Sequence, residues 1–186
     1  MFWHEGVGFR PIEERDLELI RELRNEPTTW MSLTTVGQIS TGQQQTWFEG
    51  LVRDSSRAYY TAVKEYQEFP VSSEGEFLGI VRMDEIDRIN RSIRVGLDII
   101  PEKRGQGYGT RLMRAIIKYC FDMLNMHRVW LCVLDNNEVA RKLYNNTGFK
   151  TEGIEREAVF RDGRYHDYHI MSILENEYRH NLDEQM

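Results

Sequence analysis

Three glycines at alternate positions mark the segment of the chain that is best suited to bind an anion. The segment 101–110, "PEKRGQGYGT", follows an apolar stretch and precedes a long amphipathic one. A strand that enters a glycine-rich turn and then a helix leaves backbone N–H groups unpaired at the positive end of the helix dipole, where phosphate can bind. A dinucleotide fingerprint would need glycine in place of Thr110, and a P-loop would need Gly-Lys-Ser/Thr. A flexible turn that binds nothing is the alternative interpretation.

A second group of spaced residues lies further along, at Asn137-x-x-Ala140-x-x-x-Tyr144-x-x-x-Gly148-Phe149. Asn137 is suited to cap a helix through its side-chain oxygen. Tyr144 offers a phenol that can donate a proton. A core aromatic on the face that it shares with Ala140 is the other interpretation of Tyr144.

The elements that must position these residues begin with a strand over 7–11 and two amphipathic helices. Residues 15–25 space Leu17, Ile20 and Leu23 as a helix does. Ser40 or Thr41 can cap the second helix. Its predicted apolar side consists of Trp47, Phe48, Leu51 and Val52.

Strand-like segments then dominate the chain. Segments 57–66, 76–86 and 91–100 are rich in β-branched or aromatic residues and predict three antiparallel strands. Pro70 and the serines of 67–76 predict a long exposed hairpin loop between the first two. A helix over 108–124 has Leu112, Ile116 and Cys120 on one line.

The C-terminal third alternates strand, helix and hairpin. The apolar run 128–134 predicts a strand buried on both sides, and 137–149 a short helix that ends before Gly148. Asp162-Gly163 predicts a hairpin turn, and the polar tail from Glu175 is expected to fray. The order β-α-α-β-β-β-α-β-α-β-β predicts an α/β fold with one mixed sheet and helices on both faces.

Composition sets the class of protein. The chain has 186 residues, 40% of them hydrophobic, which predicts a single domain over 1–186 with a full core. The net charge of −6 argues against nucleic-acid binding and is compatible with a cationic substrate. The N-terminus lacks a signal-peptide pattern and no apolar run could span a membrane, so we expect a cytoplasmic protein with Cys120 and Cys132 reduced.

With both motifs in this order, the chain resembles the GCN-five-related N-acetyltransferase (GNAT) superfamily. Its hallmark, R/Q-x-x-G-x-G/A, matches Arg104-x-x-Gly107-x-Gly109, and the resemblance extends from "FRPIEERDLELI" to "DGRYHDYHIMSIL". It implies a mostly antiparallel sheet that splays between two central strands, and acetyl-CoA as cosubstrate. No metal is expected, because His166 and His169 lie three apart on a predicted strand and face opposite sides.

The resemblance also implies roles for individual residues. Tyr144 would protonate the departing thiolate, and Asn137 would bind the pantetheine arm, cap a helix, or do both. The backbone N–H of Leu97 or Asp98 would stabilise the oxyanion. The residues expected to bind the cosubstrate are Leu97, Asp98, Ile99 and Ile100 along the pantetheine arm, and Arg104, Gly105, Gln106, Gly107, Tyr108, Gly109 and Thr110 at the pyrophosphate.

The general base is where this chain departs from the pattern of the family. Deprotonating a lysine-like amine at pH 7 costs about 4 to 5 kcal/mol, so a base is useful. Histone-type members carry a glutamate at the position that matches Ile93, beside Arg94, so no carboxylate stands there. Asp84 and Glu85 are the candidates, and on a regular strand only one of them can face the site. A solvated acidic patch is the alternative for both.

The terminal segments resemble a branch with ribosomal-protein N-terminal, spermidine and amino-sugar-nucleotide acetyltransferases. This implies direct attack of a small amine, such as an amino-sugar nucleotide or a polyamine, in a ternary complex. A protein N-terminus as acceptor, or a non-catalytic acyl-CoA-binding module, remains open, and a homodimer is compatible with the sequence. The predicted acceptor-pocket walls are Arg24, Asn25, Trp30, Trp47 and Tyr168.

Overall fold

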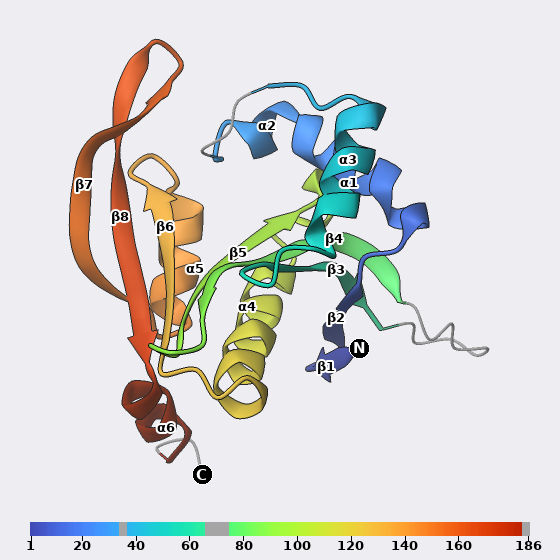
Figure 1. Ribbon diagram of the computed structural model, residues 1–186. Coiled ribbons are helices and arrows are strands. Elements are labelled where there is room, and N and C mark those ends of the chain that lie inside the picture. The colour runs from blue at the N-terminus through green and yellow to red at the C-terminus, as the bar shows by residue number, and fades with distance from the viewer. Residues whose placement is uncertain (34–36, 66–74, 184–186) are drawn as a thin grey trace.

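The computed structural model describes residues 1–33, 37–65 and 75–183, which form one sheet with helices on both faces (Figure 1). Short 3₁₀ turns occupy Glu14–Asp16 and Pro101–Lys103, and a π-helical turn occupies Tyr119–Met123. The strands are β1 (Phe2–His4), β2 (Val7–Pro11), β3 (Ala58–Lys64), β4 (Glu76–Asp87), β5 (Ser92–Ile99), β6 (Arg128–Leu134), β7 (Lys150–Arg161) and β8 (Arg164–Leu174). The helices are α1 (Leu17–Asn25), α2 (Pro27–Trp30), α3 (Thr41–Leu51), α4 (Tyr108–Lys118), α5 (Glu138–Asn146) and α6 (Glu175–Asp183).

The sheet has the order β1-β2-β3-β4-β5-β6-β8-β7. Every neighbouring pair is antiparallel except β5 and β6, which are parallel. This pair is joined only between Ser92–Arg94 and Arg128–Trp130. From Val95 onward, β5 therefore has no pairing with β6 on that side. The predicted splay between two central strands is confirmed.

Alternating side chains on β4 divide the core between the two faces. Val81 and Met83 pack in the large cluster that also contains Leu112 and Ile116 of α4. Ile80 packs instead with Ile20 of α1, in a cluster to which α3 also contributes. Because successive strand residues point to opposite faces, α4 covers one face and the α1–α3 group the other. Figure 1 shows the same division, with the β7–β8 hairpin extending beyond both.

The apolar line predicted for residues 108–124 is confirmed. Leu112, Ile116 and Cys120 are fully buried, and α4 continues into the π-helical turn before the chain enters β6. Both cysteines are free. Among the described residues, no helix is long and apolar enough to cross a membrane.

Two predictions about individual faces are wrong. Val52, predicted on the apolar side of α3, is 87% exposed, because the helix ends at Leu51. The polar Gln44 is buried on α3 instead. β6 is not buried on both sides. Val129 and Leu131 face the α4 core, but Trp130 and Cys132, which alternate with them on the other face, are only half-buried.

The expectation that the chain frays from Glu175 is also wrong. Residues 175–183 form α6, and the ring of Tyr178 stacks on Phe121 with 4.8 Å between centroids. The Tyr178 hydroxyl donates to Asp122 at 3.1 Å. The ring stacking and the hydrogen bond together hold α6 against the protein, although its sequence is polar overall. Most of the predicted loop over 67–76 lies outside the described residues.

Candidate functional site

The splay between β5 and β6 lies where two depressions meet. The first, which we call the turn cleft, has a volume of about 620 Å³ and extends from the glycine turn to α2 and α5. The second, the strand pocket, has a volume of about 130 Å³ and lies among β4, β5, β6 and β8. The residues that line both are Ser32, Leu97, Asp98, Asn137, Ala140 and Tyr144. The two spaces therefore communicate at the splayed end of β5.

Two different physical reasons explain why glycine stands at these positions of the turn. Gly105 and Gly107 have φ of +73° and +81°, which favours glycine, and a side chain at either would meet no atom within 4 Å. A Cβ at Gly109, by contrast, would lie 2.7 Å from Leu143 Cδ1. Gly109 therefore lets α4 pack closely against α5, whereas the open positions leave the approach to the turn clear.

The side chain of Arg104 is engaged within the protein. Its guanidinium donates to Thr28 Oγ1 and Thr29 Oγ1 at 2.5 Å each, and its Nε donates to the Ile99 carbonyl at 2.8 Å. These bonds fasten α2 to the turn. The backbone N–H of Arg104 donates to the Pro101 carbonyl at 3.1 Å, so in this structure it is already engaged within the protein. The N–H groups that remain for an anion are those of residues 105–110.

Asn137 caps α5, as one of its two interpretations predicted. Its Oδ1 accepts from the backbone N–H of Ala140 at 3.2 Å. The residue also lines both depressions. Its position therefore satisfies the cap and places its amide at the junction at the same time.

Tyr144 projects from α5 to the junction. Its ring packs edge-on against Phe149, with 5.8 Å between centroids, so it also contributes to the core. Burial and the nearby Asp98 carboxylate raise the pKa of Tyr144 to about 12, although Arg82 opposes the shift. The phenol therefore keeps its proton at physiological pH.

A row of charged side chains on the α1 face opens into the strand pocket. Arg82 and Asp98 form an ion pair, with Nη2 3.2 Å from Oδ1 and Nε 3.1 Å from Oδ2. Gly96 lies opposite Arg82 in the β4–β5 register, and a Cβ there would lie 2.9 Å from Arg82 Nη2. This glycine makes room for the guanidinium. The sequence analysis considered only the backbone of Asp98, so this pair was missed.

Asp84 and Glu85 are separated by a bulge in β4. Asp84 is buried and lines the strand pocket, and it accepts a hydrogen bond from the Tyr59 hydroxyl. Burial and this bond raise the pKa of Tyr59 to about 12. Glu85 has φ of +50° and is exposed in a separate depression, where it pairs with Arg94 at 3.2 Å. The structure therefore brings Asp84, and not Glu85, to the strand pocket.

Only one of the five predicted pocket walls lines the strand pocket, namely Tyr168 on β8. Asn25 is bonded to the backbone N–H and carbonyl of Ile39, at 2.7 and 2.9 Å, so it holds the chain before α3. Trp47 packs against Tyr59 in the α1-side core. Trp30 ends α2 outside both depressions, and Arg24 lies over the Trp47 ring.

A family model for the acetyltransferase (GNAT) domain matches residues 7–150. The chain belongs to the GNAT family. The predicted resemblance, the fold and the use of acetyl-CoA as cosubstrate are thereby confirmed, and the protein is an acetyl-CoA-dependent N-acetyltransferase.

The relatives of this GNAT enzyme include several amine acetyltransferases. Spermidine N(1)-acetyltransferase of Escherichia coli (strain K12) is 28% identical over 93% of this chain and 88% of its own length. The putative ribosomal N-acetyltransferase YdaF of Bacillus subtilis (strain 168) is 27% identical over 94% of each chain. The crystal structure of spermidine N-acetyltransferase from Vibrio cholerae in complex with CoA and spermine matches with a TM-score of 0.86 and 27% identity, covering 95% of this chain and 99% of that one.

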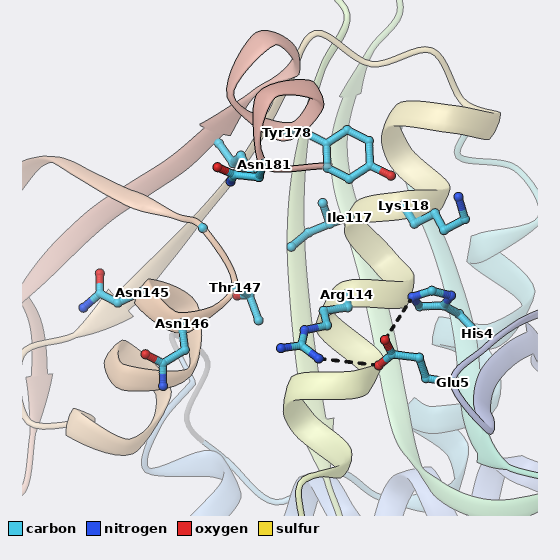
Figure 2. Close-up of a pocket in the computed structure, with 12 residues that line it drawn as sticks. His4, Glu5, Arg114, Ile117, Lys118, Asn145, Asn146, Thr147, Tyr178 and Asn181 are labelled. Carbon is cyan, nitrogen blue, oxygen red and sulfur yellow. Dashed lines mark ion pairs between the residues drawn. The ribbon is translucent and has the colours of Figure 1, made fainter. Parts of the chain in front are cut away.

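The GNAT enzyme has a further depression of about 740 Å³, which Figure 2 shows. Its lining shares no residue with the turn cleft or the strand pocket. His4 and Arg114 both point to the Glu5 carboxylate, at 3.7 and 3.6 Å. These three side chains of the depression therefore interact with one another. It contains neither Tyr144 nor the glycine turn, and size alone does not make it the acetyl-transfer site.

His166 of the GNAT enzyme links β8 to the residue that follows β6. His166 is buried, and its Nδ1 lies 2.8 Å from Asp135 Oδ1. That contact lowers the pKa of Asp135. Within the described ranges, no three His, Cys, Asp or Glu side chains are grouped to hold a metal ion.

Proposed function

We propose that this enzyme transfers the acetyl group from acetyl-CoA directly to a primary amine of a small molecule, in a ternary complex. The observation that carries the proposal is the junction of the turn cleft and the strand pocket at Asp98 and Tyr144. The glycine turn borders one depression, and charged side chains of β4 and β5 border the other. Two substrates bound in the two depressions would therefore meet in the splay, as direct attack requires.

The turn cleft is the proposed site of acetyl-CoA. The N–H groups of residues 105–110 would hold the pyrophosphate at the N-terminus of α4. The backbone of Leu97–Ile100, which β6 leaves unpaired, and the amide of Asn137 would bind the pantetheine arm. A backbone N–H of Leu97 or Asp98 would stabilise the oxyanion formed when the amine attacks.

Tyr144 is the proposed general acid. As the C–N bond forms and the C–S bond breaks, one proton must leave the nitrogen and one must reach the sulfur. The phenol is neutral because its pKa is about 12, so it has a proton to donate to the departing sulfur. Its place at the junction supports this role.

Asp84 is the proposed proton acceptor from the amine. Of the two carboxylates predicted for this role, only Asp84 lines the strand pocket. It is buried, and Arg57 and Arg94 lie 3.9 Å from its oxygens. A carboxylate at this place could take the proton from the amine, directly or through water.

The acceptor is proposed to be a small amine, such as an amino-sugar nucleotide or a polyamine. The small volume of the strand pocket supports a small acceptor. The similarity to the putative ribosomal N-acetyltransferase YdaF is the argument for a protein N-terminus instead. We also propose a homo-oligomer, because a dodecameric spermidine N-acetyltransferase from Vibrio cholerae matches with a TM-score of 0.78 and 26% identity. A non-catalytic acyl-CoA-binding module would have no need of a phenol at the junction.

Turnover tests this proposal. Purified enzyme is assayed for release of free thiol from acetyl-CoA with polyamines, amino-sugar nucleotides and N-terminal peptides. Tyr144→Phe is expected to lower kcat by about 10²- to 10⁴-fold, the range of general acid catalysis, with the Kd for acetyl-CoA unchanged. Tyr165→Phe, on the exposed part of the hairpin, is the matched control. Unchanged turnover in Tyr144→Phe would remove this residue from the mechanism.

A further inference from the structure

The carboxylates that line the strand pocket already have partners. Asp98 is paired with Arg82 at 3.1 Å. Asp84 accepts from Tyr59 and lies 3.9 Å from Arg94. A polycation needs carboxylates for its additional ammonium groups, and the described lining of this pocket offers none without a partner. Among the small amines proposed above, the charge arrangement of this pocket therefore favours one without additional ammonium groups.

Arg24 shows the opposite condition, a guanidinium without an anion. It projects from α1 over the ring of Trp47, with its Cζ 5.8 Å from the centroid. In the described part of the chain, no carboxylate lies within ion-pair distance of it. The charged and titratable groups that act on it are Arg82, Asp98, Tyr59 and Asp84, the row that opens into the strand pocket. Burial, and after it the charge of Arg82, lowers the pKa of Arg24.

Gln44 provides a second, independent observation. It is 2% exposed, and neither its Oε1 nor its Nε2 has a hydrogen-bond partner in the described structure. It precedes Trp47 by three residues on α3, so both side chains lie on one face of that helix, toward α1. A buried amide without partners destabilises the fold, and so does a partly buried guanidinium without a counterion. Both costs fall at the same place, beside Trp47.

We infer that the acceptor is an amine that also carries an anionic group, a carboxylate or a phosphate, and that Arg24 binds this group with Gln44 beside it. The inference rests on the proposed function, since it concerns the acceptor of the same reaction. The anion would give Arg24 its counterion and the Gln44 amide a hydrogen-bond acceptor. With the anion held at α1, the amine would extend past Arg82 toward Tyr144.

Matched pairs of acceptors test the inference. Lysine differs from cadaverine by one carboxylate, and glucosamine 6-phosphate differs from glucosamine by one phosphate. At least one charged member is expected to have a kcat/KM about 10- to 100-fold above its uncharged partner, as a charge-assisted hydrogen bond predicts. The pair that responds distinguishes carboxylate from phosphate. Spermidine or cadaverine as the best acceptor would overturn the inference and leave the proposed function intact. Thiol release with none of these amines would contradict both.

A variant assigns the effect to the residue. Arg24→Gln is expected to raise KM for the charged acceptor by about 10- to 100-fold, with KM for its uncharged partner and for acetyl-CoA unchanged. Arg24→Lys keeps the charge without the planar fork and is expected to restore part of the affinity, even if the glutamine variant fails to fold. Arg53→Gln, an exposed charge change after α3, is the control. Equal losses for both members of the pair would show a merely structural role and overturn the assignment.

Discussion

At the scale of single residues, the site depends on side chains that are absent as much as on those that are present. Gly105 and Gly107 leave the approach to the turn open. Gly96 leaves room for Arg82 of β4 to reach Asp98 of β5. The spacing of the glycines indicated the first function, but the second could not be read from Gly96 alone, because it requires the β4–β5 register that sets Arg82 opposite Gly96.

Gly96→Ala is expected to impair the acceptor side without unfolding the protein. The new Cβ would meet the flexible end of Arg82 at 2.9–3.0 Å, so the guanidinium moves and the backbone does not. We expect kcat/KM for the amine to fall by about 10-fold through loss of a charge-assisted pair, with acetyl-CoA affinity retained. Gly153→Ala, where a Cβ meets nothing within 4 Å, is the control for both kinetics and Tm. A variant with normal amine kinetics would show that the position of Arg82 does not matter to the acceptor.

At the scale of elements, the splay and the fastening of α2 position the site. β5 and β6 pair over only three residues each. Two hydrogen bonds of Arg104 hold α2 to the glycine turn, and a third reaches the Ile99 carbonyl of β5. Because Thr28 and Ser32 line the turn cleft, this arginine joins one wall of the cleft to the opposite one. It acts as a brace between the two walls.

Arg104→Lys is expected to weaken acetyl-CoA binding while leaving the fold intact. A lysine ammonium is a compact point charge and cannot replace a guanidinium that reaches Thr28, Thr29 and Ile99 together. We expect the Kd measured by titration calorimetry to rise by about 10-fold, with Tm nearly unchanged. Arg53→Lys, the same change at an exposed position after α3, serves as the control. An unaltered Kd in Arg104→Lys would show that the brace is not needed.

Sequence patterns predicted the elements well where the signal is local. The glycine turn, the cap at Asn137 and the alternation of strands and helices are short-range properties, and all three are found. The failures concern distant partners. The tail folds because Tyr178 meets Phe121, which lies 57 residues earlier, and Glu85 leaves the site because of a bulge that no composition reveals.

At the scale of the whole molecule, two depressions of different character meet at one point. The turn cleft extends from the glycine turn to α2 and α5, and the strand pocket carries the charged row of β4 and β5. Tyr144 lines both depressions, at the splay between β5 and β6. This arrangement would let an amine and a thioester bind at the same time.

A crystal structure of the protein with CoA tests the central claim most directly. We expect the diphosphate on the N–H groups of residues 105–110 and the sulfur beside the Tyr144 hydroxyl. The larger depression between α4 and α6, lined by Arg114, Lys118 and Tyr178, is the natural competitor. A nucleotide bound there, with the turn cleft empty, would contradict the account.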